Sequence, residues 1–298
     1  MRISELGEFA LIERFRRRIR TDSSVIKGSG DDCAVLKFDR ARYQLFTCDM
    51  LVEGVDFYSQ EDPFLVGRKS IAVSLSDIAA CAGIPAHCLV SLGLPKKTSV
   101  SFTDKLFRGM LAMARRFNLN LVGGDLSSSP KLVIDVSMLG FVEKKYFISR
   151  GNARAGDVIF VSGTLGGSIF GRHLKFTPRV KEARYLVENF RINAMIDVSD
   201  GLAQDLGHIL RQSSKGAVLF EDLLPFDIRA KGLDDLLYSG EDFELLFTAS
   251  RPQAEKILRK SGRLFKPIGE IVGQGRGITL ITTAGKERGI QPKGFRHF

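Results

Sequence analysis

Six aspartates lie at or near the ends of apolar segments, an unusual place for so many carboxylates. They are Asp32, Asp49, Asp77, Asp125, Asp197 and Asp200. Burying one ionised carboxylate without a partner is costly, so any one of them alone is best explained as a cap or a turn residue. Six carboxylates without matching lysines or histidines instead suit a hard cation with oxygen ligands, magnesium or calcium and not zinc. Because Mg²⁺ often bridges to substrate phosphates, the pattern predicts a metal–phosphate site.

Glycines give this hypothesis modest support. Gly-Gly-Asp at 123–125 lets the backbone approach a ligand closely, and Ser-Gly-Thr-Leu-Gly-Gly at 162–167 follows an apolar strand pattern. A tight turn explains the second stretch at least as well as a phosphate loop. The chain has neither a Gly-x-x-x-x-Gly-Lys-Ser/Thr loop nor the His-Arg-Asp and Asp-Phe-Gly motifs of protein kinases. An ATP enzyme with this sequence therefore belongs to neither class.

The elements that must position the aspartates alternate between strand and helix patterns, which indicates an α+β fold. Strands are predicted over residues 33–38, 43–50, 89–94, 120–122, 132–141, 158–161, 194–198, 218–220, 243–248 and 278–282. Helices are predicted over residues 5–20, 63–82, 102–117, 202–212 and 252–260, with Asp62 as the cap before Pro63. We place a boundary at 142–151 and predict domains over residues 1–145 and 146–298.

The composition indicates a globular cytoplasmic protein. With 44% hydrophobic and 26% charged residues it is too apolar for disorder, and no stretch approaches the roughly 20 apolar residues of a membrane span. Four cysteines without paired spacing favour a reducing compartment. The net charge of +10 would suit nucleic acid. However, the basic run at 14–20 shares helical spacing with Leu11, Ile12, Phe15 and Ile19, so we expect a solvated helix face and neither nucleic acid nor membrane as a partner.

A series of short motifs runs in one order along nearly the whole chain. They are Gly-Glu-Phe at 7–9, Gly-Asp-Asp-Cys-Ala at 30–34, Asp-Met-Leu-Val-Glu-Gly-Val at 49–55, Ser-Leu-Ser-Asp-Ile-Ala-Ala at 74–80, Gly-Gly-Asp at 123–125, Ser-Arg-Gly at 149–151, Ile-Asp-Val-Ser-Asp-Gly-Leu at 196–202, Ser-Gly-Glu-Asp-Phe-Glu-Leu at 239–245 and Gly-Phe-Arg-His-Phe at 294–298. Together they resemble the thiamine-monophosphate kinase family, within the superfamily that includes aminoimidazole ribonucleotide synthetase. The resemblance implies an N-terminal domain that forms a homodimer by completing a β-barrel, and a C-terminal α/β sandwich-like domain.

The resemblance also implies a reaction and a set of roles. The γ-phosphoryl group of ATP, with Mg²⁺, would pass to the phosphate of thiamine monophosphate, and Asp125, Asp197 and Arg150 would act in the transfer. The implied metal ligands are Asp32, Thr47, Cys48, Asp49, Asp77, Asp125, Asp197 and Asp200. The implied ATP contacts are Gly124, Asp125, Arg150 and Ser199. The implied thiamine contacts are Asp56, Glu241 and Phe295. Such a site suits the reaction, because two negative phosphates must be brought together.

Three features depart from the family pattern. Cys48 stands where the family has a hydroxyl, and a thiol is a poor magnesium ligand. Asp56 replaces a histidine and Arg296 an aspartate, so we expect these two to form a paired exchange. The segment 168–193 is short for the family, and we expect it to lack a helix of the second domain.

Three alternatives remain open. The first is a sibling enzyme of the superfamily that uses ATP on an amide, carbamoyl or selenium substrate, although Glu-Gly-Val at 53–55 and Gly-Glu-Asp-Phe-Glu at 240–244 favour the thiamine branch. The second is a nucleic-acid-binding protein, whose affinity would fall steeply with salt. The third is a nucleotide-binding relative without catalysis, suggested by Cys48 and Asp56.

Overall fold

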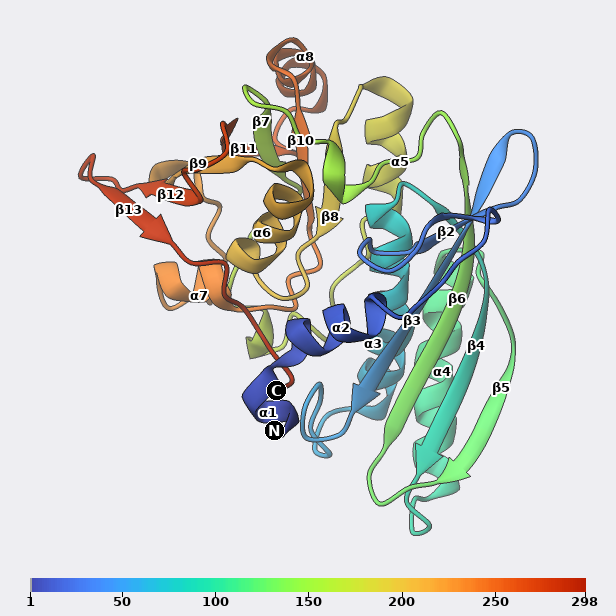
Figure 1. Ribbon diagram of the computed structural model, residues 1–298. Coiled ribbons are helices and arrows are strands. Elements are labelled where there is room, and N and C mark those ends of the chain that lie inside the picture. The colour runs from blue at the N-terminus through green and yellow to red at the C-terminus, as the bar shows by residue number, and fades with distance from the viewer. Residues whose placement is uncertain (1) are drawn as a thin grey trace.

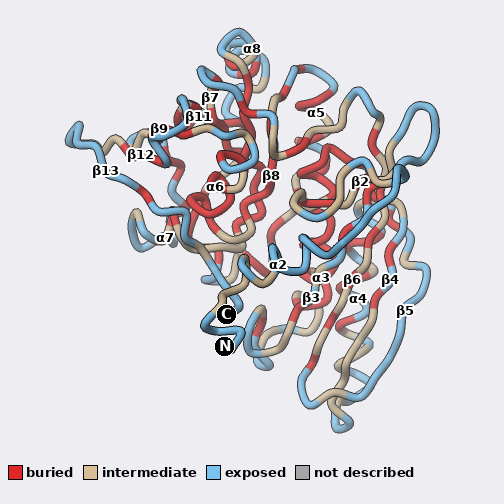
Figure 2. The backbone as a smooth tube through the Cα atoms, in the orientation of Figure 1, coloured by how far each residue is buried: buried red, intermediate tan, exposed pale blue. Residues whose placement is uncertain are grey.

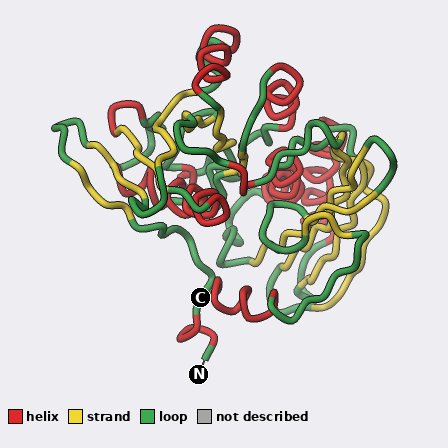
Figure 3. The backbone as a smooth tube through the Cα atoms, turned by 45° about the horizontal axis from the view of Figure 1, so that its top comes forward, coloured by secondary structure: helices red, strands yellow, loops and turns green. Residues whose placement is uncertain are grey.

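The computed structural model describes residues 2–298 as two β-sheets with helices packed on them (Figure 1). The first half forms a six-stranded sheet in the order β1-β2-β3-β6-β4-β5, antiparallel except for the β4–β5 pair. Its strands are β1 Val25–Lys27, β2 Ala34–Lys37, β3 Arg42–Val52, β4 Ile84–Leu94, β5 Asn120–Ser128 and β6 Val133–Glu143. Its helices are α1 Ile3–Leu6, α2 Glu8–Arg16, α3 Pro63–Ala80 and α4 Val100–Arg116. Helices α3 and α4 cover one face of this sheet (Figures 1 and 3).

The second half forms a seven-stranded sheet in the order β13-β12-β9-β11-β7-β10-β8, and neither sheet closes on itself among the residues described. Its strands are β7 Val158–Val161, β8 Ala194–Asp197, β9 Gly216–Phe220, β10 Leu245–Ala249, β11 Lys266–Val272, β12 Ile278–Ile281 and β13 Glu287–Ile290. Its helices are α5 Val180–Asn189, α6 Leu202–Ser213, α7 Leu233–Tyr238 and α8 Arg251–Ser261, with 3₁₀ turns η1 Arg150–Asn152, η2 Ser168–Phe170 and η3 Glu221–Leu223. Helices α6 and α7 share one core with this sheet, and α5 and α8 join the other core.

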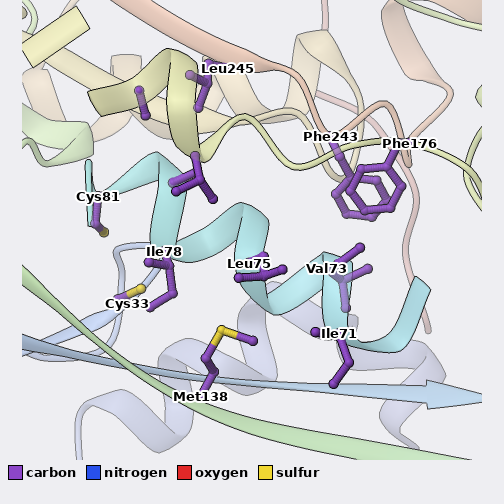
Figure 4. Close-up of a cluster of buried hydrophobic side chains, with 14 of the residues drawn as sticks. Cys33, Ile71, Val73, Leu75, Ile78, Cys81, Met138, Phe176, Phe243 and Leu245 are labelled. Atoms are coloured by element: carbon purple, nitrogen blue, oxygen red, sulfur yellow. The ribbon is translucent and has the colours of Figure 1, made fainter. Parts of the chain in front are cut away.

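Helix α3 lies between the two halves. Ile71, Leu75 and Ile78 are fully buried and lie toward β3 and β6, near Met138 (Figure 4). On the other side of the helix, the core includes the stacked rings of Phe176 and Phe243, whose centroids are 4.2 Å apart. Because one helix packs against both halves, it holds them in a fixed relation.

Most of the predicted elements are confirmed, and the N-terminal one is wrong in part. The α3 cap is as predicted, since the Asp62 side chain accepts a hydrogen bond of 2.8 Å from the Phe64 amide. The helix predicted over 5–20 breaks at Gly7, where φ is +78°, and ends at Arg16. Helix α2 has no buried residue, and Ile12, Phe15 and Ile19, which the longer predicted helix would turn inward, are exposed.

The segment 168–193 forms η2 and the ten-residue helix α5, which packs against α3. The expectation that it lacks a further helix of the family stays a prediction. Strand β11 was not predicted, because Pro267, Gly269 and Glu270 interrupt its apolar pattern. No helix within residues 2–298 is both long enough and apolar enough to cross a membrane.

Gly67 and Gly109 allow α3 and α4 to touch through their backbones. A Cβ atom on Gly67 would lie 2.0 Å from the Leu106 carbonyl oxygen, and one on Gly109 would lie 2.0 Å from that of Phe64. We therefore predict that Gly67→Ala lowers the free energy of unfolding by about 1–3 kcal/mol, because the helices must move apart. Urea unfolding measures the change, with Gly273→Ala as the control, because nothing lies within 4 Å of that position. Equal stability of the two variants would contradict the prediction.

Candidate functional site

Three of the predicted aspartates meet at the junction of the two halves. Carboxylate oxygens of Asp32, Asp77 and Asp197 all lie within 4.8 Å of one another. Asp32 comes from the turn before β2, Asp77 from the last turns of α3, and Asp197 from the end of β8. The site therefore exists only when both halves of the chain are packed on α3.

Hydroxyl groups orient these carboxylates. Thr47 donates to Asp77, and Ser76 donates to Asp197 at 2.6 Å. A fourth aspartate, Asp49, accepts a hydrogen bond of 2.6 Å from Ser74. Ser74 and Asp77 thus lie on the face of α3 that meets β3. Thr47 and Asp49 lie on the same side of β3, because side chains two residues apart in a strand share a face.

Among the residues described, Arg150 is the cationic side chain that binds this group directly. Its Nη2 donates to Asp32 Oδ1 at 2.6 Å and its Nε to Asp32 Oδ2 at 3.1 Å, a bidentate pair. One guanidinium cannot neutralise the negative charge of all the carboxylates in this group. Burial and the neighbouring carboxylates raise the pKa of Asp77 well above its usual range and that of Asp197 to about 8. Burial also raises the pKa of Asp49 to about 6. Several buried carboxylates facing one guanidinium form an oxygen-rich site that fits a divalent hard cation.

A second acidic group lies beside the first. Asp200, Asp205 and His208 bring potential ligand atoms within 4.8 Å of one another. Asp205 is buried and accepts hydrogen bonds from the amides of Asp200 (3.1 Å) and Gly201 (3.0 Å), so it shapes the turn that presents Asp200. Burial raises the pKa of Asp200 to about 6 and lowers that of His208 to about 4. Asp205 and His208 were missed, although their spacing of three on α6 places them on one helix face.

A cavity of about 380 Å³ opens next to these carboxylates. All three predicted thiamine contacts, Asp56, Glu241 and Phe295, line it. It is also lined by Ser199, one of the predicted ATP contacts, and by Asp49 and Asp200. The Phe295 amide donates to the Asp200 carbonyl at 2.9 Å, which ties the C-terminal segment to the second acidic group. The cavity and the carboxylates therefore form one continuous site.

Cys48 does not join the carboxylates, which corrects its assignment as a metal ligand. It is exposed and lies between Thr47 and Asp49 in β3. Since alternate residues of a strand point to opposite faces, its thiol points to the face of the sheet away from α3. This period-two alternation was already visible in the sequence.

Gly124 and Asp125 are also apart from the group within one chain. Both are exposed on the edge strand β5. Through Ser91 and Asp135, Asp125 is in register with Met50 of β3, three strands away. At the usual strand spacing this is a separation of about 14 Å, on the face opposite α3.

The expected exchange between Asp56 and Arg296 is not formed. Asp56 accepts a hydrogen bond of 2.7 Å from the Val52 amide, and the charges that lower its pKa are those of Lys69 and His297. Burial outweighs them and raises the pKa of Asp56. The Arg296 guanidinium instead lies over the Phe9 ring, 5.7 Å from its centroid. Asp56 and Arg296 therefore interact with different residues and do not form a pair.

Comparison with known proteins agrees with this arrangement. Family models for the N-terminal and C-terminal domains of AIR synthase related protein match residues 30–142 and 154–281. Thiamine-monophosphate kinases from Buchnera aphidicola and Aquifex aeolicus are 35% and 33% identical, covering 99% and 100% of both chains. The chain belongs to the thiamine-monophosphate kinase family. The alignments span 332 and 327 positions against 298 residues here, so these relatives have segments that this chain lacks.

Solved structures extend the comparison to three dimensions. "AaThiL complexed with AMPPCP and TMP" is 31% identical, with a TM-score of 0.87 over 100% of this chain and 99% of that one. A HypE–HypF complex is 21% identical, with a TM-score of 0.75 over 94% of this chain and 99% of that one, and shares the fold. The two-domain fold is thus common to the kinase family and to more distant proteins.

The crowding of carboxylates predicts a pH effect on stability in the absence of divalent cations. Because the pKa of Asp197 is raised from 3.8 to about 8 in the folded state, that state binds the proton more tightly. Its stabilising contribution is complete below the usual pKa and is lost as the pH rises towards 8. Between pH 5 and pH 8 the wild type should lose about 1–4 kcal/mol of unfolding free energy relative to Asp197→Asn. Urea unfolding in EDTA tests this, and parallel pH profiles would contradict it.

Proposed function

We propose that this chain transfers the γ-phosphoryl group of ATP to the phosphate of thiamine monophosphate. The observation that carries the proposal is the convergence of Asp32, Asp77 and Asp197 beside a cavity that Glu241 and Phe295 line. This arrangement supports a site for phosphates next to a site for a cationic aromatic molecule. Kinship over the full length of the chain with thiamine-monophosphate kinases supports the same reaction.

The reaction requires positioning and charge neutralisation more than a strong base. The bond between the γ-phosphorus and its bridging oxygen breaks and leaves ADP, while an oxygen of the acceptor phosphate forms the new bond to phosphorus and gives thiamine diphosphate. Donor, acceptor and carboxylates are all anionic, so cations must enter with the substrates. Arg150 is held rigidly by Asp32 at the edge of the group and can donate to a phosphate oxygen.

Magnesium fits the oxygen donors of this site. The side chains proposed to hold it are Asp32, Thr47, Asp49, Asp77, Asp197 and Asp200, with Asp125 supplied as described below. When bound, Mg²⁺ would neutralise phosphate charge and fix the orientation of the phosphate chain. Ser199, Gly124 and Arg150 are proposed to contact ATP. Burial and the neighbouring carboxylates raise the pKa values of Asp77 and Asp197, which supports this assignment, because a divalent cation would offset both effects.

The acceptor pocket suits the ring end of thiamine monophosphate. Glu241 offers a carboxylate to the positive charge, and the half-exposed ring of Phe295 offers a surface for stacking. Tyr238 and Phe243 add apolar lining. A carboxylate beside an aromatic ring suits a cationic ring, which favours thiamine monophosphate over the amide or selenium acceptors of sibling enzymes.

The direct test is formation of thiamine diphosphate from thiamine monophosphate, ATP and Mg²⁺ by the purified protein, followed by chromatography. We expect one ADP for each thiamine diphosphate and no product in EDTA. Thiamine without its phosphate serves as the control acceptor and should give no product. Absence of thiamine diphosphate at high enzyme concentration, with MgATP bound, would overturn the proposed acceptor.

We propose further that the active form is a homodimer joined through the face of the six-stranded sheet that points away from α3. On this face Phe46, Met50 and Leu89 are 43%, 58% and 48% exposed, a row of large apolar side chains open to solvent. No helix of residues 2–298 covers it, and β5 is exposed along almost its whole length (Figure 2). A second copy packed here would complete a barrel from two open sheets, bury this row, and bring its Asp125 towards the first copy.

This arrangement predicts complementation between two inactive variants. Asp125→Asn and Asp197→Asn alone should each lose activity by about 100-fold or more, since each removes a charged ligand of the reacting phosphates. If the partner supplies Asp125, a mixed dimer has one site with both wild-type residues. Unfolding and refolding an equal mixture should then restore roughly a quarter of wild-type activity. Activity that stays at the level of the single variants would contradict the shared site.

A further inference from the structure

Lys69 is buried completely in the middle of the molecule and takes no part in the carboxylate group described above. Its exposure is 0%, and it lies on α3 eight residues before Asp77, which is about 12 Å along the helix axis. A buried ammonium group is tolerated only when its donors are satisfied. The structure gives the ammonium group two acceptors, the Asp56 carbonyl at 2.6 Å and the Glu241 carboxylate, and His173 Nδ1 lies 3.1 Å from it.

His173 completes the contact around Glu241. Its Nδ1 lies 3.0 Å from Glu241 Oε2, while the ammonium group of Lys69 bonds Oε1. Its own exposure is 5%, and its Nε2 lies 3.7 Å from Glu61 Oε1. Both oxygens of Glu241 are therefore in contact with buried side chains that reach it from α3 and from the segment after η2.

The backbone of Glu241 is fixed as firmly as its side chain. Its φ of +64° lies in the left-handed region, which costs free energy for a residue with a Cβ atom. The Glu241 amide donates to the Ser199 carbonyl at 2.6 Å, and Ser168 Oγ donates to the Glu241 carbonyl at 2.5 Å. Such strain persists only where the surroundings define the conformation, so the position of this carboxylate in the cavity is closely specified.

We propose that Lys69 and His173 are positioning residues that hold the Glu241 carboxylate ionised and aimed into the acceptor cavity, and thereby set the affinity for the cationic end of thiamine monophosphate. The inference rests on the proposed function. A lone glutamate in a cavity that also has Asp56 and Asp200 would be pushed towards its neutral form. The buried ammonium group prevents this without reaching the substrate itself. Because the reacting phosphates lie at the other end of α3, the effect is confined to acceptor binding.

Steady-state kinetics of Lys69→Met, with each substrate varied in turn, test the proposal. We expect the KM for thiamine monophosphate to rise by at least about tenfold, since truncating one member of a buried pair disturbs the other. The KM for ATP and kcat should change by less than about threefold, because the phosphate site is untouched. Lys105→Met is the matched control, since that lysine is exposed and pairs with Asp62 at the start of the same helix.

A double-mutant cycle separates positioning from general support of the fold. If Lys69 acts through Glu241, Lys69→Met should add less than about twofold to the KM for thiamine monophosphate in a Glu241→Gln background. His173→Gln, which keeps a hydrogen-bonding side chain, gives the same comparison if Lys69→Met does not fold, as judged by its thermal unfolding.

Three results would overturn the proposal. The KM for thiamine monophosphate could stay unchanged in Lys69→Met, or the KM values for ATP and acceptor could rise together, or the effect could persist in full beside Glu241→Gln. If the wild type is active, any one of these results rejects the positioning role and leaves the proposed function standing. A wild type that makes no thiamine diphosphate rejects the proposed function, and this inference with it.

Discussion

Mutual repulsion among Asp32, Asp77 and Asp197 is the constraint on which the rest of this structure depends. Three carboxylates within 4.8 Å of one another, two of them buried and one half-buried, are costly, and the folded chain offsets that cost with Arg150 and with hydroxyl donors from Thr47 and Ser76. The remaining negative charge is what attracts cations and, through them, phosphates. The site is thus less stable than a neutral core would be, and its binding capacity comes from that same excess of charge.

Helix α3 connects this charged group with the acceptor cavity. It has Asp77 near one end and Lys69 two turns earlier, and its apolar side chains contact both sheets. The two halves of the chain thereby meet along a single rigid element. The distance between the phosphate site and the ring-binding cavity is set by helix geometry, which changes little with loop movements. The outer face of the first sheet and the edge strand β5 remain open for a second copy.

The sequence was sufficient to predict much of the fold and part of the site. Asp32, Asp77 and Asp197 could be found because each ends or interrupts an apolar pattern, and the outward position of Cys48 follows from strand alternation. The separation of Asp125 from these carboxylates could not be predicted, because it depends on the order of the strands, which is decided by long-range pairing. Lys69 was missed for the same reason, since His173 and Glu241 are 104 and 172 residues away along the chain.

The most direct test of the central claim is divalent cation binding by the carboxylate group. Mn²⁺, a paramagnetic substitute for Mg²⁺, can be titrated by electron paramagnetic resonance into the protein with a non-hydrolysable ATP analogue. The account predicts that Asp77→Asn weakens Mn²⁺ binding by about tenfold or more, because a carboxylate ligand becomes a neutral amide. Exchange of an exposed carboxylate, as in Asp234→Asn, should leave the affinity unchanged. Equal Mn²⁺ affinity for wild type and Asp77→Asn would contradict the account.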